Sequence, residues 1–369
     1  MKELINDIGK KKLLIILGVI VGLVVVTVVI LLLYNNLFAT KSYSSIENAV
    51  IEAAKKYYNA NPSLLPKNPN DEVSINSTSL MSGGYLDDIS KMSPDNVSCT
   101  ATVTVTNVNY NYRYTSKLQC GEIYTTRYLL EYVQKYQGTV ASGQGLYSLN
   151  GEFVYRGENP NNNVVFGGHK WNIVKFDSNG NAVLIYADKL EKMAWDDRYN
   201  AERKQNDGIN DYSVSRVHDY LTNLYNGTSL LSDKDKSLVI SHDLYIGKRS
   251  EAAIYNDGSI EKSNVLENKY IGLLPLYDYI NASLDSNCTS ALTDSCSNYN
   301  YLNANYDNNW WTLTADIEST HRVFLVTLSG SITANRASGN GYLRPVIYLA
   351  KDAIYVSGDG TAENPFKIK

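Results

Sequence analysis

The most reactive side chains in this chain of 369 residues are its four cysteines. They are Cys99, Cys120, Cys288 and Cys296. No two of them have the CxxC spacing of a zinc or redox site. The stretch SNCTSALTDSCSN places no histidine or basic residue beside Cys288 or Cys296 to activate a thiol. Four thiols allow three pairings, and we expect the two sequence-local disulfides, Cys99 with Cys120 and Cys288 with Cys296, as structural clips.

The other polar residues give no catalytic signature. The four histidines lack HxxxH and HExxH spacing, and the serines lack a GxSxG motif. The histidines are His169, His218, His242 and His321. Asp196 and Asp197 lack the alternating carboxylates of a calcium loop, so we expect them to cap a helix or pair with a cation. The sequence therefore predicts no catalytic residue, no metal site, no cofactor and no enzymatic activity.

An uncharged apolar run covers residues 13–34 and is interrupted only by Thr27. As a helix rising ~1.5 Å per residue it would reach roughly 33 Å, which matches a hydrocarbon core of about 30 Å. The apolar region of a cleavable signal peptide is only about 7–15 residues long, so we expect an uncleaved transmembrane helix. The run is preceded by Lys2, Lys10, Lys11 and Lys12. The positive-inside rule therefore predicts a cytoplasmic tail at 1–12 and a single-pass cell-membrane protein whose C-terminus is extracellular.

Charge and small residues restrict the expected partners. Gly18 and Gly22 form a GxxxG pair, which lets two membrane helices approach closely. The whole chain carries a net charge of -4, and its first 34 residues are basic, so the exterior part is more acidic than the whole. An acidic surface repels the phosphate backbone, and we expect no nucleic-acid partner.

Residues 35–121 predict a small domain of one helix and one antiparallel sheet. Apolar residues recur at helical spacing from Ile46, and Pro62 ends the pattern. The stretch VSCTATVTVTNVNYNYRYTSKLQC alternates polar and apolar residues, as in a strand pair, and a disulfide across it would contribute roughly 3 kcal/mol. In its order of membrane helix, exterior helix and disulfide-tied sheet, the region 13–121 resembles the type IV pilins and pseudopilins. That resemblance implies pilin-like partner subunits.

The character of the chain changes after a helix and linker expected at 122–151. From residue 152 onward the chain shows short strands and turns, with one helix expected at DYSVSRVHDYLTNLYNG. The segments HKWNIVKFD, YIGLLPLYDYINA, YLNANYDNNWWTLTA, GYLRPVIYLAKD and GDGTAENPFKI follow in this order. In that combined order, residues 152–369 resemble a bacterial surface-domain family related to the formylglycine-generating-enzyme branch of the C-type-lectin-like fold. The resemblance implies a lectin-like α+β domain.

Large aromatic side chains are expected to fill the core of this second domain. Trp171, Trp310 and Trp311 supply extensive apolar faces to a fold with few long helices. Arg344, directly before Pro345, is expected in or near the core and paired with a carboxylate.

Recognition is the function class that remains. The chain has 30 Tyr beside only 6 Phe, and Tyr and Asn are enriched on exposed recognition surfaces. The alternative is an AT-rich genome, which overuses the codons for Asn and Tyr everywhere. The expected ligand contacts are Tyr299, Tyr301, Tyr306, Asn308 and Asn309.

Taken together, the sequence predicts an α+β protein with an N-terminal transmembrane helix, a small pilin-like domain and a larger C-type-lectin-like domain. The expected function is that of a bacterial cell-surface module that binds an extracellular glycan or protein. Two alternatives stay open: a pseudopilin-like part of a secretion or DNA-uptake apparatus, and an oxidoreductase of the formylglycine-generating type.

Overall fold

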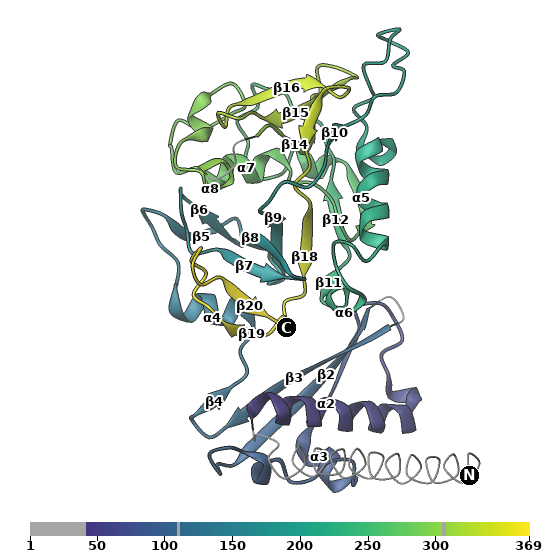
Figure 1. Cartoon of the computed structure of the whole chain (residues 1–369), viewed down its shortest axis with the longest axis vertical. Helices are drawn as coiled ribbons and strands as arrows, with labels where there is room; N and C mark the ends of the chain where they lie inside the picture. The colour runs from purple at the N-terminus through teal and green to yellow at the C-terminus, as the bar shows by residue number, and fades with distance from the viewer. Residues whose placement is uncertain (1–41, 109–110, 305–307) are drawn as a thin grey trace, which may run out of the picture. The chain divides into compact units, whose positions relative to one another are not determined.

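The computed structural model describes residues 42–108, 111–304 and 308–369 (Figure 1). These residues form two compact units. The smaller unit holds the described residues up to Leu65 together with Val73–Thr104 and Ser116–Thr125, and the larger holds Pro66–Glu72, Val105–Thr115 and Thr126–Lys369. The domain boundaries expected at residues 35, 122 and 152 stay predictions.

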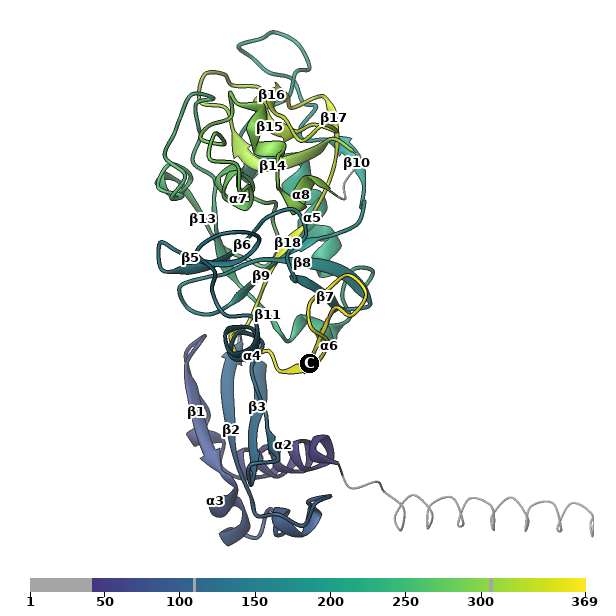
Figure 2. The ribbon, with the colours of Figure 1, turned by 90° about the vertical axis from the view of Figure 1, so that its left-hand side faces the viewer.

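The smaller unit combines a long helix with strands of a four-stranded sheet. Helix α2 (Tyr43–Ala60) begins at Ser42, whose hydroxyl accepts a hydrogen bond from the Ser45 amide at 3.1 Å. The sheet order is β1 (Glu72–Asn76), β2 (Cys99–Val108), β3 (Asn111–Cys120) and β4 (Tyr124–Thr125). Figures 1 and 2 show α2 across one face of this sheet. Its buried face consists of Ile46, Glu47, Val50, Ala53, Ala54 and Tyr58. The short helices are η1 (Pro62–Leu64), α3 (Ser77–Ser82) and η2 (Ile89–Met92).

Both predicted disulfides are confirmed. Cys99 and Cys120 join the first residue of β2 to the last residue of β3, with their Cα atoms 4.1 Å apart. Cys288 and Cys296 close a short loop of the larger unit, with their Cα atoms 4.5 Å apart. Such bonds persist in oxidising compartments outside the cytoplasm.

The larger unit contains a nine-stranded, a five-stranded and a two-stranded sheet. The nine-stranded sheet runs β11 (Val239–Ile240), β18 (Val346–Leu349), β9 (Ala182–Tyr186), β8 (His169–Phe176), β7 (Asn163–Phe166), β20 (Phe366–Ile368) and β19 (Tyr355–Ser357). Strand β6 (Glu152–Arg156) pairs with β8 and with β5 (Gly145–Leu149). The five-stranded sheet runs β10 (Lys192–Ala194), β17 (Asn340–Tyr342), β14 (Trp310–Ala315), β15 (Arg322–Val326) and β16 (Ile332–Arg336). The last sheet pairs β12 (His242–Tyr245) with β13 (Val265–Lys269).

The helices of the larger unit are short. They are α4 (Leu129–Tyr136), η3 (Tyr212–Val214), α5 (Arg216–Asn226), α6 (Asp233–Lys236), η4 (Glu261–Ser263), α7 (Leu276–Ala282), η5 (Asp294–Ser297) and α8 (Tyr301–Ala304). Helix α5 begins where the Ser215 hydroxyl accepts a hydrogen bond from the His218 amide, and it buries Val217 and Leu221.

The prediction of an α+β fold headed by a transmembrane helix is wrong. The described residues form a mixed α/β structure, in which runs of strands such as β5 to β10 and β14 to β20 are separated by short helices. Two of the strand pairs, β7 with β20 and β14 with β17, are parallel. Among the described helices, none combines the length and the apolarity that a membrane crossing requires. The run at 13–34, with Gly18 and Gly22, lies outside the described residues.

Tryptophans fill the core of the larger unit. Trp171, Trp310 and Trp311 are each no more than 1% exposed. All five residues of β9 are buried, because the strand lies between β8 and β18 inside the nine-stranded sheet. A register shift between Ile173 and Lys175 interrupts the pairing of β8 with β9.

Candidate functional site

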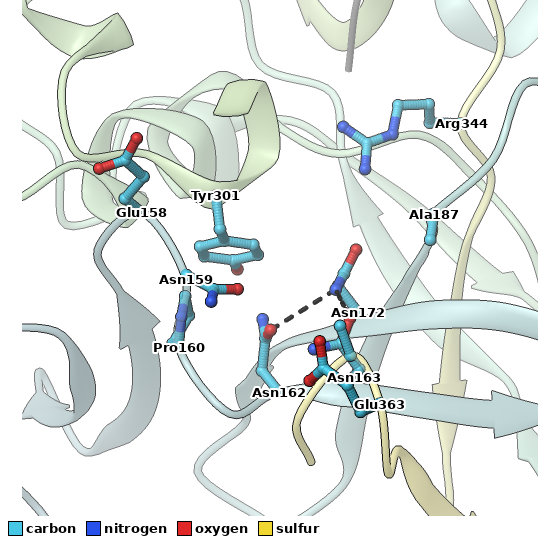
Figure 3. Close-up of a pocket in the computed structure, with 11 residues that line it drawn as sticks. Glu158, Asn159, Pro160, Asn162, Asn163, Asn172, Ala187, Tyr301, Arg344 and Glu363 are labelled. Atoms are coloured by element: carbon cyan, nitrogen blue, oxygen red, sulfur yellow. Dashed lines mark hydrogen bonds between the residues drawn. The ribbon is translucent and has the colours of Figure 1, made fainter. Parts of the chain in front are cut away.

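A pocket of about 540 Å³ opens on the larger unit where several separate segments of the chain meet (Figure 3). The loop before β7, strands β7 and β8, and the residue after β9 form part of its lining. Helix α8, the segment before β18 and the loop before β20 complete it. Four asparagines, one tyrosine, one arginine and two glutamates supply its polar side chains.

Three of these asparagines, Asn162, Asn163 and Asn172, form a hydrogen-bonded relay whose direction is set by the backbone. The Asn162 Nδ2 donates to the Ile173 carbonyl at 2.8 Å, and the Asn163 Nδ2 donates to the Gly360 carbonyl at 3.0 Å. Since a carbonyl only accepts, the amide oxygens of Asn162 and Asn163 are left to face Asn172. The Asn172 Nδ2 donates to the Asn163 Oδ1 at 3.2 Å and to the Asn162 Oδ1 at 3.5 Å. The relay therefore fixes the orientation of the Asn172 amide.

The relay holds the amide oxygen of Asn172, a hydrogen-bond acceptor, toward the pocket. Figure 3 shows the Asn172 amide oxygen pointing away from the two other asparagines, toward the side where Arg344 lies. Asn172 is half-buried, and its register partner across the strand pair is Asn163 on β7. Because this oxygen is already fixed before a ligand binds, binding costs less side-chain entropy than it would with a mobile acceptor.

Tyr301 contributes a buried hydroxyl without a hydrogen-bond partner among the described residues. The side chain lines the pocket but is only 6% exposed. Burial raises the pKa of Tyr301 and Asp278 raises it further, whereas Arg344 and, to a smaller extent, the Asn162 side chain oppose this rise. The phenol is therefore neutral near pH 7 and able both to donate and to accept. Leaving a buried hydroxyl unpaired costs about 1–3 kcal/mol, which a ligand that supplies a partner would recover.

Arg344 forms the cationic wall of the pocket. Its Nε donates to the Tyr186 carbonyl at 3.1 Å and its Nη1 donates to the Leu302 carbonyl at 2.8 Å. The guanidinium carbon lies 5.0 Å from the centre of the Trp310 ring. These two hydrogen bonds go to backbone carbonyls and hold the buried side chain in one position. The pairing of Arg344 with a carboxylate stays a prediction.

Two glutamates lie at the exposed rim. Glu158 belongs to the loop before β7, and Glu363 belongs to the loop before β20. The second loop is held by Asp359, whose carboxylate accepts from the Thr361 amide and hydroxyl at 3.0 and 2.8 Å. These bonds, the amide bond first, lower the pKa of Asp359. The rim therefore carries negative charge beside a pocket with one buried cation.

The Gly360 carbonyl accepts the hydrogen bond that orients Asn163, so the first prediction concerns the replacement of this glycine. Its φ is +84°, and an added Cβ would lie 2.3 Å from the Asn161 carbonyl oxygen. Gly360→Ala is expected to lower the free energy of unfolding by about 1–3 kcal/mol and to displace the carbonyl that orients Asn163. Thermal unfolding measures this loss. Gly168→Ala is the control, since Gly168 has φ +79° with no atom within 4 Å of an added Cβ; an equal loss in both variants would contradict the steric argument.

The structure describes four of the five residues that the sequence proposed as ligand contacts, and among these four only Tyr301 lines the pocket. Tyr301 is buried and lines the pocket, whereas Tyr299 is 61% exposed at a φ of 48° and is not part of the lining. Asn308 is half-buried and Asn309 is exposed. The Asn309 Oδ1 accepts from the Leu328 amide at 2.7 Å, away from the pocket. Tyr306 lies outside the described residues.

Sequence reasoning missed the asparagine relay and the rim glutamates. One signal was present, because the tripeptide Glu-Asn-Pro occurs twice, at 158–160 and at 363–365, and both copies contribute a glutamate to this pocket. A second signal is the position of Asn172 between buried Trp171 and Ile173, which places it on the opposite face of β8. Neither signal identifies the pocket without the pairing of β7 with β20.

Comparison with protein-family models, with curated proteins and with solved structures found no match. The resemblances to type IV pilins and to the formylglycine-generating-enzyme branch stay predictions, as do the single-pass membrane location and the pilin-like partners. Cys288 and Cys296, the thiols that the oxidoreductase alternative requires in reduced form, are bridged to each other.

Proposed function

We propose that the larger unit is a binding module outside the cytoplasm that holds a neutral sugar of an extracellular glycan in the asparagine-lined pocket. The observation that carries this proposal is the fixed polar face of the pocket. The oriented Asn172 oxygen lies in the same lining as the buried Tyr301 hydroxyl, which has no hydrogen-bond partner in the part of the chain that the structure describes. A sugar presents neighbouring hydroxyls that donate and accept at once, which suits one acceptor and one hydroxyl together.

The charges of the pocket favour a neutral ligand over an anionic one. Glu158 and Glu363 at the rim would repel a carboxylate or sulfate that approaches from solvent. Arg344 lies deeper, and its described hydrogen bonds go to backbone carbonyls. The two disulfides support a location outside the cytoplasm, where glycans are available.

The test is a binding measurement on the purified full chain with named sugars. Saturation-transfer NMR with the methyl glycosides of glucose, galactose, mannose and N-acetylglucosamine is expected to show binding of at least one. Glucuronic acid is expected to bind more weakly than methyl glucoside. Preference for the acid, or binding of none of the four glycosides, would remove the proposal in favour of a protein ligand.

Tyr301→Phe gives the sharpest variant. The substitution removes only a hydroxyl that has no partner among the described residues, so the free energy of unfolding is expected not to fall and to rise by at most about 1–3 kcal/mol. The affinity for the bound sugar is expected to fall about three- to tenfold, since one hydrogen bond contributes about 0.5–1.5 kcal/mol.

Tyr212→Phe is the matched control for this measurement. Tyr212 is 2% exposed, its hydroxyl is also unpartnered among the described residues, and it does not line the pocket. Tyr212→Phe is expected to leave the affinity unchanged.

Asn172→Asp, which removes the donor that holds the relay, is expected to weaken binding about tenfold. Full affinity in both Tyr301→Phe and Asn172→Asp would show that the sugar binds elsewhere.

A further inference from the structure

A buried charged cluster of the larger unit lies outside this pocket. The Nζ of Lys175 lies 2.9 Å from the Asp278 Oδ1 and 3.0 Å from the Glu152 Oε2. The side chains of Lys175 and Asp278 are 1% and 2% exposed, and that of Glu152 is 21% exposed. The three residues come from β8, α7 and β6.

Local backbone geometry turns Lys175 into the core. Strand β8 exposes Lys170 and buries Trp171, as a regular alternation requires, but Ile173, Val174 and Lys175 are all buried. The register shift between Ile173 and Lys175 explains this change, because a β-bulge re-aims the side chains that follow it. Lys175 pairs with Val154 on β6, two residues from Glu152.

If all three side chains are ionised, the cluster carries a net negative charge. Two carboxylates face one ammonium, and the Asp278 Oδ2 has no hydrogen-bond partner among the described residues. Burial raises the pKa of Asp278 to about 6, although Lys175 opposes the shift. Burial also opposes the charge on Lys175, but Asp278 and the other neighbours outweigh it and raise its pKa. A buried ion pair loses much of its attraction to desolvation, so a reaction that removes both charges would relieve this cost.

We infer that Lys175 and Asp278 condense spontaneously to an intramolecular amide bond, with Glu152 as the proton carrier. The Nζ–Cγ bond forms, and one Cγ–O bond of Asp278 breaks. The departing oxygen leaves as water with the two protons that Nζ gives up, and Glu152 accepts a proton from Nζ and returns it to that oxygen. The ammonium and carboxylate charges cancel in the amide, and no oxidant or other reactant is needed.

The surroundings of Lys175, Asp278 and Glu152 favour the formation of this amide bond. Lys175 and Asp278 are held in contact by the fold, which replaces a collision by an intramolecular step. The ring of Tyr277 lies 4.9 Å from the Lys175 Nζ, and its hydroxyl accepts from Nζ at 3.1 Å. This enclosure keeps bulk water from the bond once it has formed. Glu152 is the one member of the three with appreciable exposure, so the leaving water has a route to solvent through its side.

Mass spectrometry of the purified full chain tests the proposal. Both disulfides are first reduced, and the intact mass is expected to lie one water below the mass of the sequence. Tryptic digestion is expected to yield a branched peptide that joins the segments around Lys175 and Asp278. An unmodified intact mass in a folded chain, together with two separate peptides, would overturn the proposal.

Two variants separate this bond from other dehydrations. Glu152→Gln keeps the size of the side chain but removes its basicity, so the folded variant is expected to retain the full sequence mass. Asp278→Asn is expected to form the same amide with loss of ammonia and so to reach the same final mass as the wild-type product. A loss of water that persists in Glu152→Gln, or that maps to another peptide, would contradict the mechanism.

Discussion

Replacing Trp311 with alanine is expected to lower the free energy of unfolding of the larger unit by about 3–5 kcal/mol. Trp311 is fully buried in β14, opposite Leu325 on β15. Its Nε1 donates to the Met193 carbonyl at 3.0 Å, and an added Cβ at Gly341 would lie 3.0 Å from its ring. The truncation would leave both a cavity and a carbonyl without its donor, in a place where the backbone has little room to collapse.

Tryptophan fluorescence during denaturant unfolding measures this loss in the correct unit. All four tryptophans of the chain, Trp171, Trp195, Trp310 and Trp311, belong to the larger unit. Trp311→Phe keeps much of the volume and is expected to cost less than Trp311→Ala. Tyr255→Ala, at a side chain 68% exposed, is expected to change the free energy by less than about 0.5 kcal/mol. A loss below about 1 kcal/mol in Trp311→Ala would mean that the core is not packed as described.

Acidification is expected to destabilise the larger unit through His242. The imidazole stacks on the Tyr348 ring with centroids 3.7 Å apart, and neither ring nitrogen has a hydrogen-bond partner among the described residues. Burial lowers the pKa of His242 from its ordinary value near 6.5 to about 3. The unfolded chain therefore binds a proton between pH 6.5 and 3 that the folded chain does not. Stability is complete above pH 6.5 and falls as the pH decreases, by about 1.4 kcal/mol per pH unit within that window.

The difference between wild type and His242→Phe isolates this effect. Phenylalanine preserves the stack but takes up no proton, so the variant is expected to lose about 2–3 kcal/mol less than wild type between pH 6.5 and 4.5. The comparison is needed because burial raises the pKa of Glu261, and this carboxyl acts in the opposite direction as the pH falls. Parallel stability curves for the two proteins across this range would show that His242 titrates normally in the folded state.

Local patterns predicted the features that depend on neighbouring residues. The alternation between Cys99 and Cys120 indicated a strand pair, and its closure by a disulfide is confirmed. The short spacing of Cys288 and Cys296 favoured the second bridge, which is also confirmed. In each case the two partners are brought together by a single turn or loop, so little knowledge of the tertiary fold is required.

The candidate site could not be predicted in this way because its parts meet through long-range pairing. Asn172 faces Asn163 across a hairpin, but Gly360 reaches Asn163 only through the parallel pairing of β7 with β20. Lys170 and Lys175 look alike in the sequence, yet one is exposed and the other is buried. The shift of register in β8 explains this difference, and no residue type in the sequence indicates that the register shifts there.

The pairing of β7 with β20 also affects how the larger unit acquires its structure. Val164 and Phe366 are register partners although they lie about 200 residues apart in the sequence. During synthesis, the amides and carbonyls along one edge of β7 therefore stay unpaired until β20 has been made, when nearly all of the unit has left the ribosome. An open strand edge is a template for pairing with other chains, so this edge of β7 is exposed to aggregation until β20 pairs with it.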